Sequence, residues 1–473
     1  MQIGSGPILP LDAADFSGSI PVLIIGGGGC GLTAALSAKE NGADVLVLER
    51  DSSALGTTAM STGLIPGPGS TFQKAKGIED SPEIFAADIM AKTHGETDPD
   101  MALHLAREGA PTVEWLAKVH GVPLSLVDSF RYPGHSKMRM HGTPSRSGHE
   151  LMGALHAAAE RLSIDIITQA PVSQLFADAA GKVHGVRITR PDGSLEDIAC
   201  DTMILACCGF AGSHSMVAEN IPEIAEATFF GHPGNKGDAL LWGRALGGEV
   251  ADIHAYQGHG GLAYGYGVPI LWAHIVHGGF QVNAEGKRFA NEALGYSEHA
   301  KEVVAQTGHY AWSIYDERIH GLMNEFDDYG DAIKAGCIRH AASLDELCAI
   351  TGLPAQVKRT VADVAVMAEG RMADPLGRDF TTGGVLKPPY KAVKICGALF
   401  HTQGGLVVDR DARVLRADKS ALPNLFAGGG AARGISGPSC WGYLAGNGLL
   451  TATAFGRLAG RAAAAQVKHA NIG

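Results

Sequence analysis

The sequence has 473 residues, of which 45% are hydrophobic and 18% charged, so it carries enough apolar material for two packed cores. Its formal net charge of -11 and the absence of a sustained Lys/Arg run exclude a basic footprint for nucleic acid, so we expect a small-molecule substrate as partner. The eight cysteines show no CxxC and no metal-type spacing, so disulfides, zinc and iron–sulfur clusters are unsupported and we expect no metal.

The first twenty residues contain neither Lys nor Arg and therefore lack the charged start of a signal peptide. The longest apolar runs, such as 22–25, are broken by glycine well before the roughly 20 residues that cross a bilayer. We therefore expect a cytoplasmic protein without a membrane span.

The first predicted element is a strand at residues 22–25, followed by a glycine-rich turn and a helix that ends near Asn41. The turn has the pattern GxGxxG. Gly26 is predicted to make the tight turn, Gly28 to let a pyrophosphate reach the helix N-terminus, and Gly31 to allow the helix to pack closely on the strand.

A second strand, residues 45–48, delivers Glu49 at the spacing where a carboxylate accepts hydrogen bonds from the ribose of an adenosine. Strand, turn, helix, strand and acid in this order predict a Rossmann-type dinucleotide site. The alternative is an ordinary glycine-rich turn with a solvated Glu49. The pattern alone does not separate NAD from FAD.

Several later segments resemble the fumarate reductase and succinate dehydrogenase flavoprotein superfamily, in the family's order and over about residues 18–465. They are a second flavin-contacting loop at 56–63 (GTTAMSTG), a strand-to-glycine turn at 204–210 (ILACCGF), the HPG loop at 232–238, the RFxNE segment at 282–292, the HTxGG segment at 401–405 and a second strand-to-glycine turn at 425–430 (LFAGGG).

The resemblance implies an α/β fold: a Rossmann-type FAD-binding domain at 1–250 and 371–473, with an inserted α+β capping domain at 251–370 that covers the substrate. FAD is expected to be noncovalent, because no histidine lies between Glu49 and Ser70, where some relatives attach it. The electron acceptor or donor stays open. The residues expected to contact FAD are Gly26, Gly28, Gly29, Cys30, Gly31, Glu49, Arg50, Thr57, Thr58, Ser61, Gly63, Val172, Ala206, Gly209, Gly429, Gly430 and Ser439.

Extended runs ending near Ile25, Ala206 and Ala427 are expected to bring several strand ends to one edge of a sheet, where open α/β sheets bind ligands. The apolar segment after Pro438 is predicted to be a closing helix. Its N-terminal amides, near Gly437, would stabilise negative charge on a reduced flavin.

Two positions depart from the fumarate-type pattern. Tyr296 stands where the resemblance places an acid arginine, and Cys440 where it places an arginine that clamps a carboxylate. These departures argue against a dicarboxylate substrate. A tyrosine after RFxNE resembles the 3-ketosteroid dehydrogenase branch, in which it is the base that removes a proton beside a ketone. Ser436, or backbone amides near Gly437 at the start of the closing helix, is predicted to polarise the carbonyl. The steroid branch usually has a tyrosine there, so the steroid itself is not implied.

By resemblance, His232 and His401 lie close to the substrate or the flavin, and both are candidate catalytic residues; each can also be a structural loop histidine. Arg288 is interpreted as a structural ion-pair residue. A group of aromatic residues in the capping domain forms either its own core or a pocket for an apolar ring: Tyr256, Tyr264, Tyr266 and Trp272.

The leading hypothesis is an FAD-dependent dehydrogenase that forms an α,β-unsaturated product from a cyclic or otherwise uncharged ketone. The second is a reductase of an activated C=C bond, in the manner of fumarate or urocanate reductase. The third is a flavin-binding protein with vestigial activity, because both arginines of the fumarate mechanism are missing.

Overall fold

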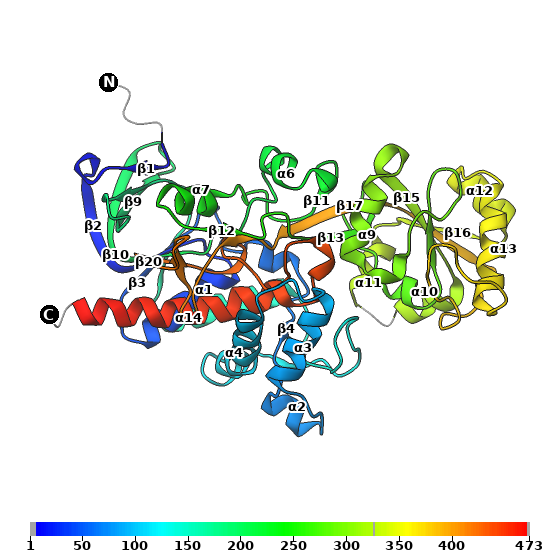
Figure 1. Ribbon diagram of the computed structural model, residues 1–473, viewed down its shortest axis with the longest axis horizontal. Helices are drawn as coiled ribbons and strands as arrows, with labels where there is room; N and C mark the ends of the chain where they lie inside the picture. The colour runs from blue at the N-terminus through cyan, green and yellow to red at the C-terminus, as the bar shows by residue number, and fades with distance from the viewer. Residues whose placement is uncertain (1–5, 325–326, 471–473) are drawn as a thin grey trace. The chain divides into compact units, whose positions relative to one another are not determined.

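The computed structural model describes residues 6–324 and 327–470, which form two compact units. The first unit comprises Met1–Ser213, Gly231–Ala255 and Thr402–Gly473, and the second comprises His214–Phe230 and Tyr256–His401 (Figure 1). The sequence placed the capping domain at 251–370. The second unit runs further because β17 (Tyr390–Thr402) pairs with β15 (Tyr310–Asp316), and it takes in β11 (Thr228–Phe229), which also pairs with β17.

The core of the first unit is a parallel sheet whose strands end at one edge. Ile25 lies opposite Leu48 on one side and Leu205 on the other, and Leu205 lies opposite Ala427. The predicted meeting of strand ends is therefore confirmed. In spatial order the strands are β20 (Ala421–Ala427), β10 (Leu195–Leu205), β2 (Phe16–Ile25), β3 (Val45–Leu48) and β7 (Asp165–Ile167).

Strand β10 has two neighbours on its outer side. Its last residues pair with β20, and its first residues pair with antiparallel β9 (Val183–Thr189), which continues to β8 (Val172–Ala177) and β1 (Ile8–Leu9). The short β19 (Arg413–Leu415) pairs with β20. The sheet is thus parallel at its ligand-facing edge and partly antiparallel further back.

Two glycines bring α14 (Asn447–Ala470) against α1 (Gly29–Glu40), as Figure 1 shows. A Cβ on Gly456 would lie 2.5 Å from the carbonyl oxygen of Cys30, and one on Gly460 would lie 2.2 Å from that of Ala34. The backbones therefore approach more closely than side chains would allow. The long C-terminal helix completes the core around the N-terminal βαβ unit.

A helical layer with a small sheet surrounds a buried ion network in the same unit. The Arg139 guanidinium, fully buried, donates to the Asp80 carboxylate at 2.8 Å and to Asp88 at 2.5 Å. The elements of this layer are β4 (Ile65–Pro66), β5 (Ser125–Leu126), β6 (Met140–Gly142), α2 (Thr71–Ala75), α3 (Pro82–Lys92), α4 (Pro99–Lys118) and α5 (Gly148–Arg161). The unit also contains α7 (Asp238–Ala245) and the strand pair of β12 (Val250–Ala251) with β18 (Gly405–Leu406).

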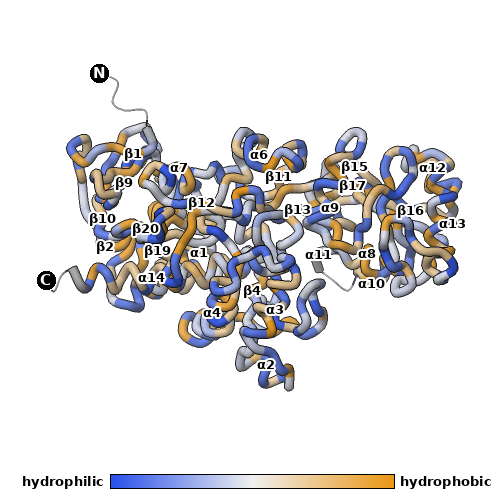
Figure 2. Tube along the Cα trace, in the orientation of Figure 1, coloured by the Kyte–Doolittle hydropathy of each residue, from blue (hydrophilic) through white to orange (hydrophobic). Residues whose placement is uncertain are grey.

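The second unit has its own sheet and its own core. Apolar residues recur along α13 (Gln356–Ala368) at Val357, Val361 and Val364, all buried, at the spacing of one helix face. Figure 2 shows hydrophobic and hydrophilic segments alternating along the tube of this unit. Its other strands are β13 (Tyr256–Ala263), β14 (Phe280–Val282) and β16 (Ile338–Ala341), and its other helices are α6 (His214–Asn220), α8 (Ala273–Val276), α9 (Tyr296–Val304), α10 (Glu317–Met323), α11 (Asp327–Lys334) and α12 (Leu344–Thr351).

Within residues 6–324 and 327–470, no helix combines the length and the hydrophobicity that crossing a bilayer requires.

Candidate active site

The turn between β2 and α1 admits only glycine at two positions. Gly26 has φ of +104°, and a Cβ there would lie 2.6 Å from the carbonyl oxygen of Ala206. A Cβ on Gly31 would lie 1.8 Å from the carbonyl oxygen of Gly26. Both glycines thus serve the packing of the turn itself, as the sequence pattern predicted.

Gly28 has a different environment. It is the N-cap of α1 without a side-chain capping bond, and the nearest atom to a Cβ built there is the Cα of Gly56, at 4.0 Å. Protein atoms therefore leave space in front of the N-terminus of a 12-residue helix. The space at the N-terminus and the positive end of the helix dipole suit a pyrophosphate at this place.

Glu49 follows β3 and is held by backbone amides. Its Oε2 accepts from the N–H of Gly27 at 2.9 Å, and its Oε1 accepts from the N–H of Asp51 at 3.0 Å. The side chain is almost fully buried, and each carboxylate oxygen retains a further lone pair for a ribose hydroxyl. The backbone carbonyl of Glu49 accepts from Ala170, two residues before half-buried Val172 at the start of β8.

The second loop is fixed against the first. Thr58 Oγ1 accepts from the N–H of Gly29 at 3.2 Å, and Ser61 Oγ donates to the Thr58 carbonyl at 2.7 Å. Gly63 has φ of +67°, and a Cβ there would lie 2.9 Å from the carbonyl oxygen of Ser147. The predicted loop residues are therefore brought beside the N-terminus of α1.

The HPG loop is tied to the same two loops. Asn235 Nδ2 donates to Thr57 Oγ1 at 2.9 Å, and His232 Nε2 lies 3.0 Å from the Asp51 carboxylate. The Nδ1 atom of His232 accepts from the N–H of Gly234 at 3.2 Å, so Nε2 is the ring nitrogen that faces Asp51 as a donor. Both ring nitrogens thus position the loop within the first unit, and contact of His232 with substrate stays a prediction.

Further predicted residues pack around these loops. The Arg50 guanidinium donates to the Gly234 carbonyl at 2.8 Å. A Cβ on Gly209 would lie 2.0 Å from Thr402 Oγ1, and one on Gly430 would lie 2.9 Å from Cys208 Sγ. The glycine turns after β10 and β20 therefore pack against each other at the edge where Gly26 ends β2.

The C-terminal loop differs from the prediction. We expected a helix directly after Pro438, but α14 begins at Asn447, so the amides near Gly437 are not its N-terminus and that prediction is wrong. The intervening chain folds back, because a Cβ on Gly442 would lie 1.8 Å from the carbonyl oxygen of Ser436. Ser439 instead precedes a short 3-10 turn, Cys440–Gly442.

Ser436 is buried, and its Oγ donates to Gln403 Oε1 at 2.8 Å. Gln403 belongs to the predicted HTxGG segment, and its carbonyl accepts from the N–H of Gly434. The hydroxyl is thus fixed in orientation by the neighbouring loop. Its oxygen keeps its acceptor capacity, whereas its proton is used by Gln403.

The sequence prediction missed two residues: Asn447, the first residue of α14, and Tyr443, which follows the 3-10 turn before it. Asn447 is fully buried, and among the described residues neither atom of its amide has a hydrogen-bond partner. An orphaned amide costs about 1–3 kcal/mol, so this position fits a ligand with both donors and acceptors, such as a flavin pyrimidine. Tyr443 is also buried, which raises its pKa, and its hydroxyl is hydrogen-bonded by the backbone amides of Gly446 and Gly448. The sequence analysis placed both residues inside a helix that was predicted to start after Pro438, so neither was recognised as a site residue.

In the second unit, Tyr296 is the first residue of α9 and is half-buried among other rings. Its ring centroid lies 5.3 Å from that of His259 and 6.4 Å from that of Trp272. The imidazole of His259 stacks on Phe400 at 5.4 Å with an interplanar angle of 8°. The candidate base thus stands in an aromatic cluster made of residues from one unit.

His259 is a donor in this cluster. Burial lowers its pKa to about 3, so the ring is neutral at physiological pH. Its Nδ1 accepts from the N–H of Gly261 at 3.1 Å, which leaves the proton on Nε2. The sequence prediction missed His259, although a lone histidine in a glycine-rich strand was a visible signal.

The arginines near this cluster are neutralised. Arg288 donates to Glu292 at 2.7 Å and to Asp374 at 2.7 Å, and Arg378 donates to Glu292 at 3.1 Å. Burial alone would raise the pKa of Glu292, but these guanidiniums lower it to about 2. Arg288 is therefore the structural ion-pair residue that the sequence indicated.

The remaining predicted residues of this unit differ in their burial. Tyr256 is fully buried and belongs to the core, whereas Tyr264 and Tyr266 are each 46% exposed. Trp272 is half-buried beside Tyr296. His401 lies near the end of β17 and is half-buried.

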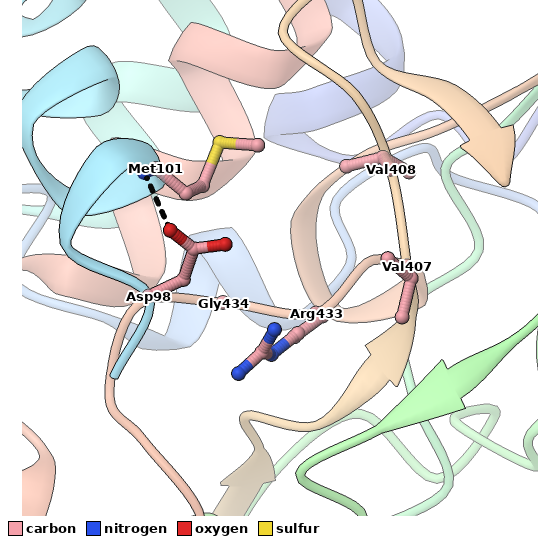
Figure 3. A pocket seen from close by; sticks show the side chains of 6 residues that line it. All are labelled: Asp98, Met101, Val407, Val408, Arg433 and Gly434. Atoms are coloured by element: carbon pink, nitrogen blue, oxygen red, sulfur yellow. Dashed lines mark hydrogen bonds between the residues drawn. The ribbon is translucent and has the colours of Figure 1, made fainter. Parts of the chain in front are cut away.

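A pocket of the first unit lies beside the start of the C-terminal loop. Figure 3 shows the Arg433 side chain beside it; Arg433 Nε donates to the Asp252 carboxylate at 2.6 Å. None of the predicted site residues lines it. Its lining consists of Asp98, Met101, Val407, Val408, Arg433 and Gly434.

The first unit is thus a Rossmann-type nucleotide site whose loops and orphaned amide suit a flavin dinucleotide. Residues 21–449 match the model of a family described as "FAD binding domain", and the chain belongs to this family. It is 29% identical over 450 residues to the fumarate reductase (cytochrome) of Shewanella frigidimarina, covering 94% of this chain and 77% of that protein. To the urocanate reductase of Eggerthella lenta it is 27% identical over 466 residues, covering 94% and 75%.

Among solved structures, the open conformation of a flavocytochrome c3 fumarate reductase matches with a TM-score of 0.83 at 27% identity, covering 96% of this chain and 80% of that chain. The 3-ketosteroid-delta4-(5alpha)-dehydrogenase from Rhodococcus jostii RHA1 matches with a TM-score of 0.74 at 24% identity, covering 96% and 98%, which shows the fold. The predicted superfamily, fold class and FAD are confirmed. The chain is an FAD-dependent oxidoreductase, and it is similar in sequence to fumarate and urocanate reductases.

Proposed function

We propose that this oxidoreductase dehydrogenates the bond next to the carbonyl of a cyclic or otherwise uncharged ketone, with Tyr296 as the base. The observation that carries the proposal is the environment of Tyr296: aromatic rings, a neutral His259, and two arginines whose charges are already paired. A carboxylate buried there would lack a cationic partner, which is costly. An uncharged ring of a substrate would not incur this cost of burying a charge.

The reaction requires removal of a proton from the carbon beside the carbonyl and of a hydride from its neighbour. Bound FAD would accept the hydride. Tyr296 would take the proton, and because a free tyrosine has a pKa of about 10, hydrogen-bonded neighbours must assist the transfer. The Nε2–H of His259 is one donor for the developing enolate oxygen. Ser436, the donor expected from the sequence, gives its proton to Gln403 and could serve only after that hydrogen bond is exchanged. His232 and His401 stay candidates for substrate contact.

Tyr296→Phe tests the proposal, because it removes the hydroxyl while keeping the ring and its packing. Flavin reduction by the ketone substrate should slow on the order of 10²–10⁴-fold, with FAD content unchanged. Exchange of the substrate's α-proton with solvent deuterium should stop as well. Tyr266→Phe, an exposed tyrosine of the same unit, is the matched control and should react like wild type. Near wild-type reduction by Tyr296→Phe would show that the base lies elsewhere.

Reduction of an activated C=C bond is the second candidate, favoured by the fumarate and urocanate reductases among the relatives. Anaerobic titration separates the candidates. Bleaching of the flavin by ketones indicates the dehydrogenase, and reoxidation of the reduced flavin by enones or by urocanate indicates the reductase. Silence towards a broad panel would favour the vestigial reading.

Fumarate and succinate should be poor substrates in either direction, because neither position 296 nor position 440 is an arginine. Steady-state and stopped-flow measurements with both dicarboxylates check this. Efficient fumarate reduction by the pure protein would contradict the assignment of an uncharged substrate.

A further inference from the structure

A row of contacting rings runs through the second unit, starting beside Tyr296. Trp272 lies 6.4 Å from Tyr296 and 5.9 Å from His274, measured between ring centroids. His274 in turn lies 5.6 Å from Tyr315. Tyr315 and His274 are fully buried, so the row passes through the core.

The row continues by hydrogen bonds to a half-buried histidine. The hydroxyl oxygens of Tyr315 and Tyr329 are 2.7 Å apart, and the Tyr329 hydroxyl lies 2.8 Å from Nδ1 of His320. Tyr329 is fully buried, whereas His320 is partly exposed. A buried phenol pair is therefore connected to the side of the unit where His320 meets solvent.

The direction of these hydrogen bonds follows from the state of His320. Burial and the nearby Lys391 lower its pKa, so its ring is neutral at physiological pH and Nδ1 can accept. We assign Tyr315 as the donor to Tyr329, which leaves the Tyr329 proton for Nδ1 of His320 in the tautomer that carries its own proton on Nε2. Both distances fall within the range of about 2.6–3.2 Å in which protons pass between hydrogen-bonded groups.

We propose that Tyr315 and Tyr329, with His320 as proton acceptor, form a redox-active site that draws strong oxidising equivalents away from Trp272 and Tyr296. A phenol loses an electron more easily when its proton moves at the same time to a hydrogen-bonded base. Electron transfer between contacting rings is also fast, because tunnelling weakens steeply with distance.

The electron balance is simple. An oxygen-centred radical, of the class that can form where reduced flavins meet dioxygen, takes one electron from Trp272 and is itself reduced. The indole radical cation takes one electron from the phenol pair, and the Tyr329 proton passes to His320. A neutral tyrosyl radical and an imidazolium remain, and no bond between heavy atoms forms or breaks. The proposal does not depend on Tyr296 being the catalytic base.

Pulse radiolysis of the purified full chain with azide radical, a one-electron oxidant of indoles, tests the proposal. Wild type should show tryptophan radicals that decay into a hydrogen-bonded tyrosyl radical, identified by electron paramagnetic resonance after freeze-quenching. Tyr329→Phe should remove most of that signal. His320→Leu should slow its formation on the order of tenfold or more. Tyr390→Phe, a buried tyrosine outside the row, is the control and should leave it unchanged.

Wild-type protein gives a second readout that needs no variant. The electron paramagnetic resonance spectrum of the wild-type radical, recorded in H2O and in D2O, should show an exchangeable proton shared with the imidazole of His320, as the contact between Tyr329 and His320 requires. A tyrosyl radical without such a proton, or an unchanged tyrosyl signal in Tyr329→Phe, would overturn the proposal. Core packing alone predicts both of those outcomes.

Discussion

Gly28 and Gly31 lie in one turn, yet alanine should mainly weaken FAD binding at Gly28 and mainly destabilise the fold at Gly31. At Gly31 the new Cβ would lie 1.8 Å from the carbonyl oxygen of Gly26, so backbone must move. Overpacking typically costs 1–3 kcal/mol, and a backbone overlap this deep should cost at least about 3 kcal/mol in the free energy of unfolding. At Gly28 the nearest atom is 4.0 Å away, so the flavin-free protein should lose only about 0.5–1 kcal/mol from the poorer N-cap.

The methyl group of Gly28→Ala would instead enter the space assigned to the pyrophosphate. If it costs FAD the same 1–3 kcal/mol, the dissociation constant should rise roughly 5- to 150-fold. Denaturant unfolding with and without saturating FAD, together with flavin fluorescence titration, measures the two effects separately. The reasoning fails if Gly28→Ala binds FAD like wild type, or if it destabilises the flavin-free protein as much as Gly31→Ala does.

Three further predictions concern buried polar groups. Burial lowers the pKa of His259 to about 3 and the pKa of His299 to about 4. Between about pH 6.5 and 4 the unfolded chain therefore binds protons that the folded chain does not. As the pH falls through this range, the free energy of unfolding should decrease by up to about 1.4 kcal/mol per pH unit for each ring. His299→Leu should make the slope of unfolding free energy against pH shallower by that amount; an unchanged slope would contradict the assignment. Asn447→Leu should stabilise the flavin-free protein by about 1 kcal/mol and weaken FAD binding, since it removes an orphaned amide; thermal melts with and without FAD decide this. Arg139→Leu should cost about 3–5 kcal/mol by denaturant unfolding, because it leaves the Asp80 carboxylate buried without its partner.

The nucleotide-binding half was predictable because its signals are local. A strand, a glycine turn and an acid follow one another within about thirty residues, and periodicity and turn chemistry report on such spans. The register of β2, β10 and β20 then places the separate glycine clusters at one edge, as their shared pattern indicated.

The start of α14 and the extent of the second unit were not predictable in this way. The chain between Pro438 and Asn447 is apolar enough for a helix, but Gly442 packs on Ser436, a contact without a sequence period. Likewise β17 joins the second unit through pairing with β15, some eighty residues earlier. His259 was not predicted as a site residue because its proposed role depends on its contacts with Tyr296 and Phe400, which are remote in sequence.

The packing of α14 on α1 sets the timing of cofactor uptake. Ser37 donates to the carbonyl of Arg457 across a separation of 420 residues, and Gly456 and Gly460 make the same contact possible. On a ribosome the N-terminal glycine turn emerges long before the helix that supports it. Since pairing of such remote segments is slow, the glycine turn stays an incompletely formed binding site until α14 packs on α1. Firm capture of the flavin therefore requires that α14 has been synthesised and has packed on α1.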